Sequence, residues 1–297
     1  MATVTKSEFH PADGATRGLA TARRSTAAAS WTAYKALLLR DLTVLRKQLN
    51  EFLPRTLLQP FLLVFVFTYV FPKIGQGIGG GMGGPAGESA FATVLVAGVV
   101  GVTILFQGIQ SVALPMVQEF GYTKEIEDRV LAPLPVSLVA LGKVTSGALQ
   151  GLLAALLVFP IAAVVPANDV HLEVNWPVLL TLAPLACITA SALGLTFGTR
   201  FEPRTVPMMF GVVVIPLTFL GCVYYSWVDL GPIKVGGFSW LQWLVLVNPL
   251  VYMSEGFRAA LTSADHMTLA AVYLVLAGFA ALFLYLGING FKKRVLS

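Results

Sequence analysis

The chain has 297 residues, of which 56% are hydrophobic and 12% are charged, and its mean hydropathy is +0.78. A soluble domain carries about a quarter of charged residues and could not bury so much apolar surface in its core. The composition therefore excludes an ordinary soluble enzyme or binding domain and indicates an integral membrane protein, with a net charge of +5.

The first 30 residues are polar and rich in Ala, Thr and Ser, without the central apolar region of a secretory signal peptide. A segment of this composition cannot bury enough apolar surface to fold by itself. We therefore expect residues 1–30 to form a disordered cytoplasmic tail.

An amphipathic helix is predicted over residues 31–53. Its apolar residues recur at spacings of three and four, so they share one helical stripe, whereas Arg40, Arg46 and Lys47 fall elsewhere. We expect the helix to lie in the cytoplasmic membrane interface with its basic face toward lipid headgroups, and Pro54 to mark the turn into the membrane. Packing on a partner protein is an alternative that does not exclude the first. The apolar stripe comprises Trp31, Tyr34, Leu38, Leu42, Leu45, Leu49 and Phe52.

Six apolar stretches follow, and most are long enough for the ~20-residue helix that crosses a bilayer core. Only helices and closed barrels can cross a membrane, and runs this long and continuous predict helices. Residues 54–297 are thus predicted to form an all-α, polytopic domain with six transmembrane helices. The stretches are Pro54–Phe71, Phe91–Val117, Val136–Val165, Pro177–Gly198, Pro207–Tyr225 and Leu269–Gly290.

Basic residues gather before the first stretch and after the second, fourth and sixth. The opposite loops hold few beyond Lys73, Lys234 and Arg258. By the positive-inside rule, both termini are predicted to be cytoplasmic. The basic balance thus indicates orientation in the membrane rather than binding to nucleic acid.

The sequence carries no nucleotide-binding motif. The segment Gly75–Gly87 begins with a formal match to GxGxxG, but that fingerprint requires a strand before it and a helix after it in a soluble βαβ unit. We interpret the segment as a flexible external linker. An ATP-driven function would therefore require a separate polypeptide.

The sequence also lacks a catalytic or metal-ligand constellation, so we expect no enzyme activity, cofactor or metal site in this chain. The histidines fall in the tail and in external loops, and Cys187 and Cys222 are interpreted as small packing residues. The histidines are His10, His171 and His266.

Uncharged polar residues enter several of the apolar stretches, where they can either join helices or line a passage. Interhelical hydrogen bonds are worth about 0.6–2 kcal/mol in membranes, and packing is the default interpretation. Gly147xxxGly151 and Gly194xxxGly198 support close helix packing. These uncharged polar residues are Gln107, Gln110, Ser111, Thr145, Ser146, Gln150, Thr189, Ser191 and Thr196.

Lys143 is the nearest candidate for a charged residue within a span, but its side chain can snorkel to the cytoplasmic interface. The absence of a charge near the midplane of the membrane disfavours an ion-coupled carrier.

The cytoplasmic stretch Gln118–Pro135 lies between the second and third apolar stretches and alternates acidic with basic residues. Pro133 and Pro135 end its predicted helix before the next span. A short charged helix between two membrane helices is suited to transmit movement from a soluble partner protein to the membrane domain. The equal alternative is that this stretch is a solvated loop without such a role. Its charged residues are Glu119, Lys124, Glu125, Glu127, Asp128 and Arg129.

The segment Trp227–Met267 is too apolar for a simple external loop. Its run from Phe238 to Val247 is too short to span a bilayer and predicts a re-entrant or interfacial element. Asn248-Pro249 is expected to break the helix and turn the chain.

From Trp31 to Arg294 the chain resembles the permease subunits of ABC-2-type exporters, which include daunorubicin-resistance, nodulation-factor and polysaccharide exporters. The resemblance rests on the amphipathic helix, on the EIEDRVLAPLPVSLVALGK pattern at Glu125–Lys143, and on the Asn248-Pro249-Leu250 and Glu255-Gly256-Phe257-Arg258 motifs. It implies a half-transporter of the bacterial inner membrane that dimerises with an identical or related permease. It also implies two P-loop ATPase subunits, which bind the ATP and Mg.

The resemblance also implies roles for individual segments. Gln118–Arg129 is similar to the coupling helix that sits on the ATPase, and Trp31–Phe52 to the connecting helix that touches it. Phe238–Arg258 is similar to the short helices that close the exit on the outer side, with Asn248, Pro249, Glu255 and Arg258 as gate residues. The residues expected to face the passage between protomers are Phe61, Phe65, Gln107, Gln110 and Ser111.

The resemblance implies export of an amphipathic, drug-like or lipid-like substrate. The long Gly-rich external loop favours this substrate class over a polysaccharide. Export of a cell-surface polysaccharide or lipid-linked glycan by the same architecture is the alternative. A self-sufficient secondary carrier or channel is a second alternative, and a structural protein of the membrane a third.

Overall fold

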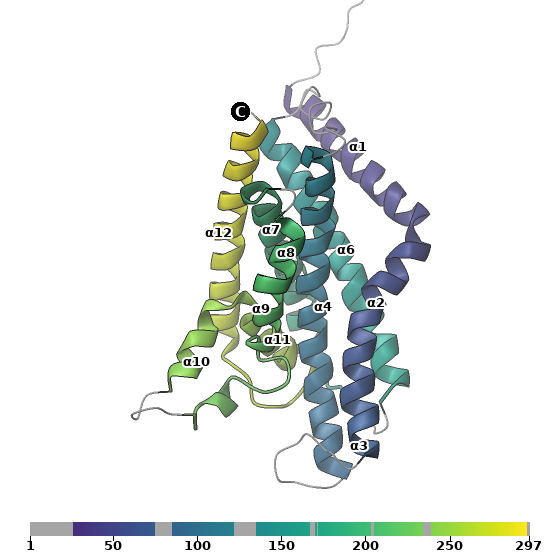
Figure 1. Cartoon of the computed structure of the whole chain (residues 1–297), viewed down its shortest axis with the longest axis vertical. Helices are drawn as coiled ribbons and strands as arrows, with labels where there is room; N and C mark the ends of the chain where they lie inside the picture. The colour runs from purple at the N-terminus through teal and green to yellow at the C-terminus, as the bar shows by residue number, and fades with distance from the viewer. Residues whose placement is uncertain are drawn as a thin grey trace, which may run out of the picture.

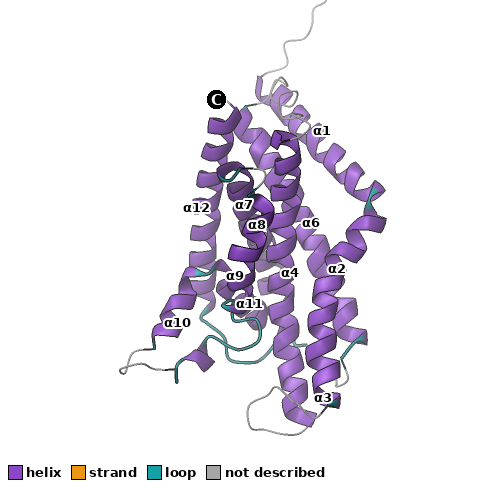
Figure 2. Ribbon diagram, in the orientation of Figure 1, coloured by secondary structure: helices purple, strands orange, loops and turns teal. Residues whose placement is uncertain are grey.

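The computed structural model describes residues 26–74, 85–121, 135–166, 170, 172–202, 205–233 and 239–295. Across these residues every regular element is a helix, joined to the next by loops and turns (Figure 2). The predicted all-α class is therefore confirmed. Most of the predicted tail lies outside the described residues, and its last five residues, from Thr26, already belong to the first helix.

Five helices are long and apolar enough to cross a membrane. The first combines α2 (Leu49–Phe65), η1 (Val66–Val70) and α3 (Phe71–Lys73) into one continuous stretch of 25 residues. At 1.5 Å per residue, even this length gives about 37 Å, which exceeds the ~30 Å hydrocarbon core. The others are α4 (Pro85–Gly121), α6 (Val136–Val164), α7 (Trp176–Arg200) and α12 (Leu269–Val295).

The predicted fifth stretch, Pro207–Tyr225, forms a shorter helical segment. It consists of α8 (Val206–Met209), η2 (Phe210–Val214) and α9 (Ile215–Phe219). The helix ends at Phe219 because the chain turns at Gly221 and Cys222, where Cys222 has a φ of 53°, a left-handed conformation that no α-helix contains. The boundary at Tyr225 was therefore wrong, and a sixth span stays a prediction.

The centre of the bundle is the contact of α4 with α7, and α6, α11 and α12 pack around this pair (Figure 1). Small residues permit the close approach. A Cβ atom on Gly194 would lie 2.8 Å from the Ile109 carbonyl oxygen, and one on Gly147 would lie 2.6 Å from the Val112 side chain. The predicted packing role of the two GxxxG motifs is thus confirmed at these glycines.

Two polar residues of α7 join it to α12. Thr189 Oγ1 donates to the Leu276 carbonyl at 3.4 Å and Thr196 Oγ1 donates to the Phe283 carbonyl at 3.0 Å. The single proton of each hydroxyl is shared with the carbonyl four residues back in its own helix, at 2.8 Å for Thr189 and 3.0 Å for Thr196. These threonines join helices rather than line a passage, in agreement with the packing interpretation.

The amphipathic helix is present as α1 (Thr26–Lys47), which leaves the bundle as an oblique arm (Figure 1). The chain bends at Gln48, whose φ and ψ of −103° and 16° are not helical. The turn expected at Pro54 was therefore misplaced, since Pro54 lies inside α2. α1 is fastened to α6 by a 2.7 Å hydrogen bond between the Tyr34 hydroxyl and Thr145 Oγ1.

Before the last helix, the chain forms a run of short helices. η3 (Val228–Leu230), α10 (Trp240–Leu244) and η4 (Val245–Val247) precede α11 (Pro249–Leu261), in which every residue is buried. The break between η4 and α11 falls at Asn248-Pro249, as predicted. Figure 1 shows α10 at the periphery and α11 against the bundle, at the end opposite the C-terminus. Phe238, at the start of the predicted run, lies outside the described residues.

Candidate functional site

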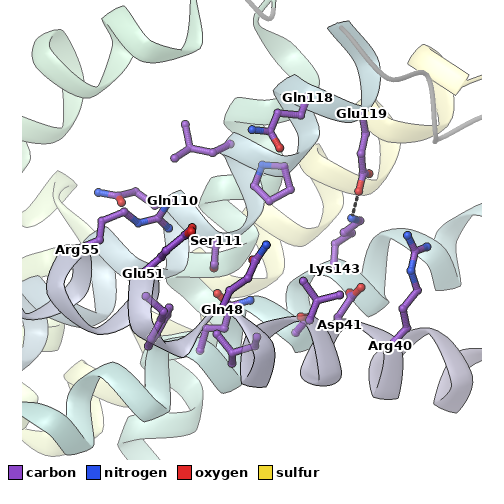
Figure 3. A pocket seen from close by; sticks show the side chains of 17 residues that line it. Arg40, Asp41, Gln48, Glu51, Arg55, Gln110, Ser111, Gln118, Glu119 and Lys143 are labelled. Atoms are coloured by element: carbon purple, nitrogen blue, oxygen red, sulfur yellow. Dashed lines mark hydrogen bonds and ion pairs between the residues drawn. The ribbon is translucent and has the colours of Figure 1, made fainter.

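A polar cavity of about 640 Å³ lies where the bend between α1 and α2 faces α4 and α6 (Figure 3). We call it the elbow cavity. Only five of its 17 lining residues are apolar, namely Val44, Leu45, Phe52, Leu114 and Pro115. The polar lining residues are Arg40, Asp41, Gln48, Glu51, Arg55, Gln110, Ser111, Gln118, Glu119, Lys143, Ser146 and Gln150.

The inner wall of the elbow cavity holds a buried ion pair. Lys143 Nζ on α6 donates to Glu119 Oε1 on α4, and the two residues are 7% and 6% exposed. The expectation that Lys143 snorkels to the interface was therefore wrong, because a carboxylate from the neighbouring helix meets it in the interior. A buried charge of this kind requires such a partner.

The outer rim of the elbow cavity comes from the arm and the start of α2. Arg40, Gln48, Glu51 and Arg55 are exposed and Asp41 is half-buried. The side chains of Asp41, Glu51 and Arg55 form no hydrogen bond or ion pair with any other residue that the structure describes. Figure 3 shows Glu51 and Arg55 on the same side of the opening as Gln110.

The residues expected to face the passage separate into two groups. Gln110 and Ser111 line the elbow cavity. Gln107 lies one turn away and accepts a 3.1 Å hydrogen bond from Thr56 Oγ1 through its Oε1 atom. Its buried Nε2 atom has no hydrogen-bond partner among the described residues.

Phe61 and Phe65 lie farther along α2 than the lining residues and do not line the elbow cavity. Their rings stack with a centroid distance of 5.6 Å, and Phe65 stacks on Tyr69 at 5.3 Å. The structure thus does not bring the phenylalanines together with the glutamines within one protomer. Whether they meet across two protomers stays a prediction.

The predicted coupling segment is represented by its first residues only. Glu119 is described at the end of α4, whereas Lys124, Glu125, Glu127, Asp128 and Arg129 lie outside the described residues. Glu119 faces inward to Lys143 and lines the elbow cavity. Its place is at the end of the bundle that also carries α1 and the C-terminus (Figure 1).

The predicted interfacial residues of α1 have different surroundings. Trp31 is 58% exposed, stacks on Tyr34 at a centroid distance of 5.6 Å, and has Lys35 Nζ 5.1 Å from its ring centroid. Arg40 lines the elbow cavity, whereas Arg46 and Lys47 are exposed and do not.

The predicted gate residues fall at the start and in the middle of α11. Asn248 caps the helix, because its Oδ1 accepts from the Leu250 amide at 2.9 Å. Its Nδ2 donates to the Leu217 carbonyl at 2.7 Å and so ties α11 to α9. Pro249 follows as the first helical residue, where its missing amide has no cost.

Glu255 and Arg258 form an ion pair one turn apart, and both side chains are fully buried. Glu255 Oε1 accepts from the Trp227 amide and Oε2 from the Met267 amide, both at 2.8 Å. Arg258 Nη2 donates to the carbonyls of Cys222 at 3.0 Å and Tyr225 at 3.2 Å. The pair therefore fixes the turn that follows α9 and the loop that precedes α12.

The arrangement of the described residues is suited to binding and to mechanical support. Among these residues no group of three or more His, Cys, Asp or Glu could hold a metal ion. The elbow cavity offers charges of both signs to a polar ligand, and the Glu255–Arg258 pair holds the short helices at the opposite end. No sequence pattern predicts the contact between Glu119 and Lys143, which are 24 residues apart.

Comparison with known proteins supports the resemblance noted for the sequence. The family model for the ABC-2 type transporter matches residues 32–262. The inner membrane transport permease YadH of Escherichia coli K12 is 29% identical over 191 residues, which cover 64% of this chain and 70% of YadH. The YadH of Shigella flexneri matches with the same identity and coverage.

Proposed function

The chain belongs to the ABC-2 type transporter family, and we propose that it is the membrane subunit of an ATP-driven exporter in the bacterial inner membrane. The observation that carries this proposal is the family match, which extends from α1 through α11. In this proposal the chain has six spans with both termini in the cytoplasm. The relative YadH is named as an inner membrane transport permease.

The energy comes, in this proposal, from a separate P-loop ATPase subunit that is present in two copies and binds ATP with Mg. The sequence has no nucleotide-binding motif of its own. Two permease protomers, identical or related, assemble with the ATPase pair. The charged segment Gln118–Arg129 makes the contact with the ATPase.

The mechanism follows from how this segment joins the bundle. ATP-driven closure of the ATPase pair moves the segment, which is continuous with the end of α4. The Glu119–Lys143 pair connects that end to α6, so α4 and α6 move together. A rigid displacement of the two helices then switches the passage between arrangements open to either side.

The substrate, in this proposal, is an amphipathic molecule that resembles a drug or a lipid. Affinity for such a molecule comes mainly from apolar contact area with a few polar contacts. The polar elbow cavity and the exposed apolar face of α2 offer both kinds of contact within one protomer.

Affinity purification of the tagged chain from its native membrane, followed by mass spectrometry, tests the proposal. We expect a stoichiometric P-loop ATPase to co-purify in mild detergent. A matched preparation that carries Glu125→Lys and Glu127→Lys should retain much less of it. Reproducible absence of any ATPase from intact, monodisperse protein would overturn the proposal in favour of a self-sufficient carrier or channel.

A further inference from the structure

We propose that the elbow cavity binds the zwitterionic headgroup of a membrane amphiphile, with a phosphate at Arg55 and an ammonium at the carboxylates of Asp41 and Glu51. The inference rests on the proposed export of amphipathic molecules, for which it names the headgroup class and the site. It places the headgroup between α1, α2, α4 and α6 of one protomer.

The size and polarity of the elbow cavity favour a headgroup over a whole apolar molecule. Its volume of about 640 Å³ falls within the ~300–1,000 Å³ of small-molecule pockets, but those pockets are lined mostly by apolar side chains. The elbow cavity is lined mostly by charged and amide side chains. An apolar molecule would remove these polar groups from water and would form no hydrogen bonds in place of those that they make to water.

The balance of charge favours a zwitterion over an anion. Within the lining, Lys143 and Glu119 neutralise each other. Of the remaining charged side chains, one cation, Arg55, and two anions, Asp41 and Glu51, form no ion pair among the described residues. A purely anionic headgroup would be attracted by Arg55 and repelled by the two carboxylates, whereas a zwitterion places its phosphate at the first and its ammonium at the second.

Three of these rim groups are available to a ligand. Asp41, Glu51 and Arg55 form no hydrogen bond or ion pair within the described part of the chain. A guanidinium binds phosphate through two parallel hydrogen bonds, and a carboxylate accepts strongly from an ammonium. The four amides and two hydroxyls of the lining add neutral donors and acceptors.

The apolar surface beside the elbow cavity accounts for the tail. Leu58 and Leu62 follow Arg55 by three and seven residues, so they lie on the same side of α2. They are 60% and 47% exposed and belong to the first of the long apolar helices. A lipid whose headgroup sits at Arg55 can therefore lay its chains along α2, toward the middle of the membrane.

Lipid binding to the purified, delipidated chain in detergent tests the inference, with native mass spectrometry as the readout. The probes are dioleoyl phosphatidylethanolamine, which is zwitterionic, and dioleoyl phosphatidylglycerol, which is anionic. Free O-phosphoethanolamine, measured by isothermal titration calorimetry, separates a lipid headgroup from a soluble phosphate compound. We expect the zwitterionic lipid to bind about tenfold more tightly than the anionic one.

Charge-neutral variants locate the site. Asp41→Asn with Glu51→Gln should remove the preference for the zwitterionic lipid, while Arg55→Gln should weaken both lipids by about tenfold through loss of the phosphate contact. Lys292→Gln with Lys293→Gln is the control, because these exposed cations of α12 lie at the same end of the bundle but outside the lining. The control should bind both lipids as the unaltered chain does.

Three results would overturn the inference: tighter binding of the anionic lipid, equal affinity for free O-phosphoethanolamine and its lipid, or unchanged binding by all cavity variants. The experiment uses the chain without an ATPase. Failure here, with an ATPase still captured from the native membrane, would therefore refute the headgroup site and leave the proposed export function intact.

Discussion

Arg258 forms an ion pair with Glu255 on the same face of α11, and neither side chain has any exposed surface. Between them, the two side chains bind the backbone at Cys222, Tyr225, Trp227 and Met267. These contacts join the turn after α9, the short helices and the loop before α12. The pair thus organises the end of the bundle where the predicted gate lies.

Removing one member of this pair should be strongly destabilising. Arg258→Met leaves the Glu255 carboxylate buried without its cation, and loss of one partner of a buried pair costs about 3–5 kcal/mol. We expect a lower midpoint of thermal unfolding, measured by fluorescence-detected size exclusion in detergent. The double variant Arg258→Met with Glu255→Leu should be no worse than the single change, since the effects of contacting residues are not additive. Single variants as stable as the unaltered chain would contradict this assignment.

The close contact of α4 with α7 predicts opposite effects at two glycines. A Cβ on Gly194 would lie 2.8 Å from the Ile109 carbonyl oxygen, whereas a Cβ on Gly278 would meet nothing within 4 Å. Gly194→Ala should therefore push two buried helices apart and lower the unfolding midpoint. Gly278→Ala should be neutral, or stabilising by up to about 1 kcal/mol through helix propensity. Equal effects of the two changes in the same thermal assay would show that α4 and α7 do not pack this closely.

Much of the fold could be predicted because long apolar runs admit few structures in a membrane. The five long helices and the break at Asn248-Pro249 follow from length and from proline chemistry. The bend at Gln48 could not be found this way, since Pro54 is the conspicuous helix breaker nearby and α2 accommodates it. The end of α9 was also missed, because it depends on a left-handed residue, Cys222, that Arg258 holds from a distant helix.

The candidate site was only partly predictable for a similar reason. The charge pattern and the family resemblance predict roles for Glu119, Gln110 and Ser111, and the three residues line one cavity. Lys143, Glu51 and Arg55 join them only because α1, α2, α4 and α6 pack in a particular register. Sequence spacing does not fix register between helices whose faces are apolar nearly all round, as those of α6 and α7 are.

The arm formed by α1 should loosen when its hydrogen bond to α6 is removed. Tyr34→Phe deletes the hydroxyl that lies 2.7 Å from Thr145 Oγ1, a bond worth about 0.5–1.5 kcal/mol. We expect faster amide hydrogen exchange across residues 31–47 and little change in α7. Thr145→Val should act alike, and the double variant should add nothing further. Unchanged exchange in α1 would mean that other contacts hold the arm.

The Glu119–Lys143 pair should be required for coupling between the ATPase and the bundle. Lys143→Met leaves a buried carboxylate and removes the ion pair that joins the end of α4 to α6, so it should reduce substrate-stimulated ATP hydrolysis by the reconstituted complex. The exchanged pair, Glu119→Lys with Lys143→Glu, restores opposite charges and should recover part of the activity. Lys292→Met, which removes an exposed cation of α12 outside the elbow cavity at the same end of the bundle, is the control. No loss in the Lys143 variant would remove the pair from the mechanism.

The acidic segment beyond α4 should respond to reversal of its charge. Glu125→Lys with Glu127→Lys turns two predicted contacts with the ATPase into repulsive ones, since a charge-complementary interface loses several kcal/mol, about a hundredfold or more in affinity, when like charges meet. We expect substrate-stimulated ATP hydrolysis to be abolished while membrane insertion stays normal. The matched control is Glu173→Lys with Asp265→Lys, which makes the same change of charge in exposed loops at the opposite end of the bundle. Because these loops are far from the proposed ATPase contact, the control should hydrolyse ATP normally. Unchanged stimulation in the first variant, or equal loss in both, would refute the coupling role of this segment.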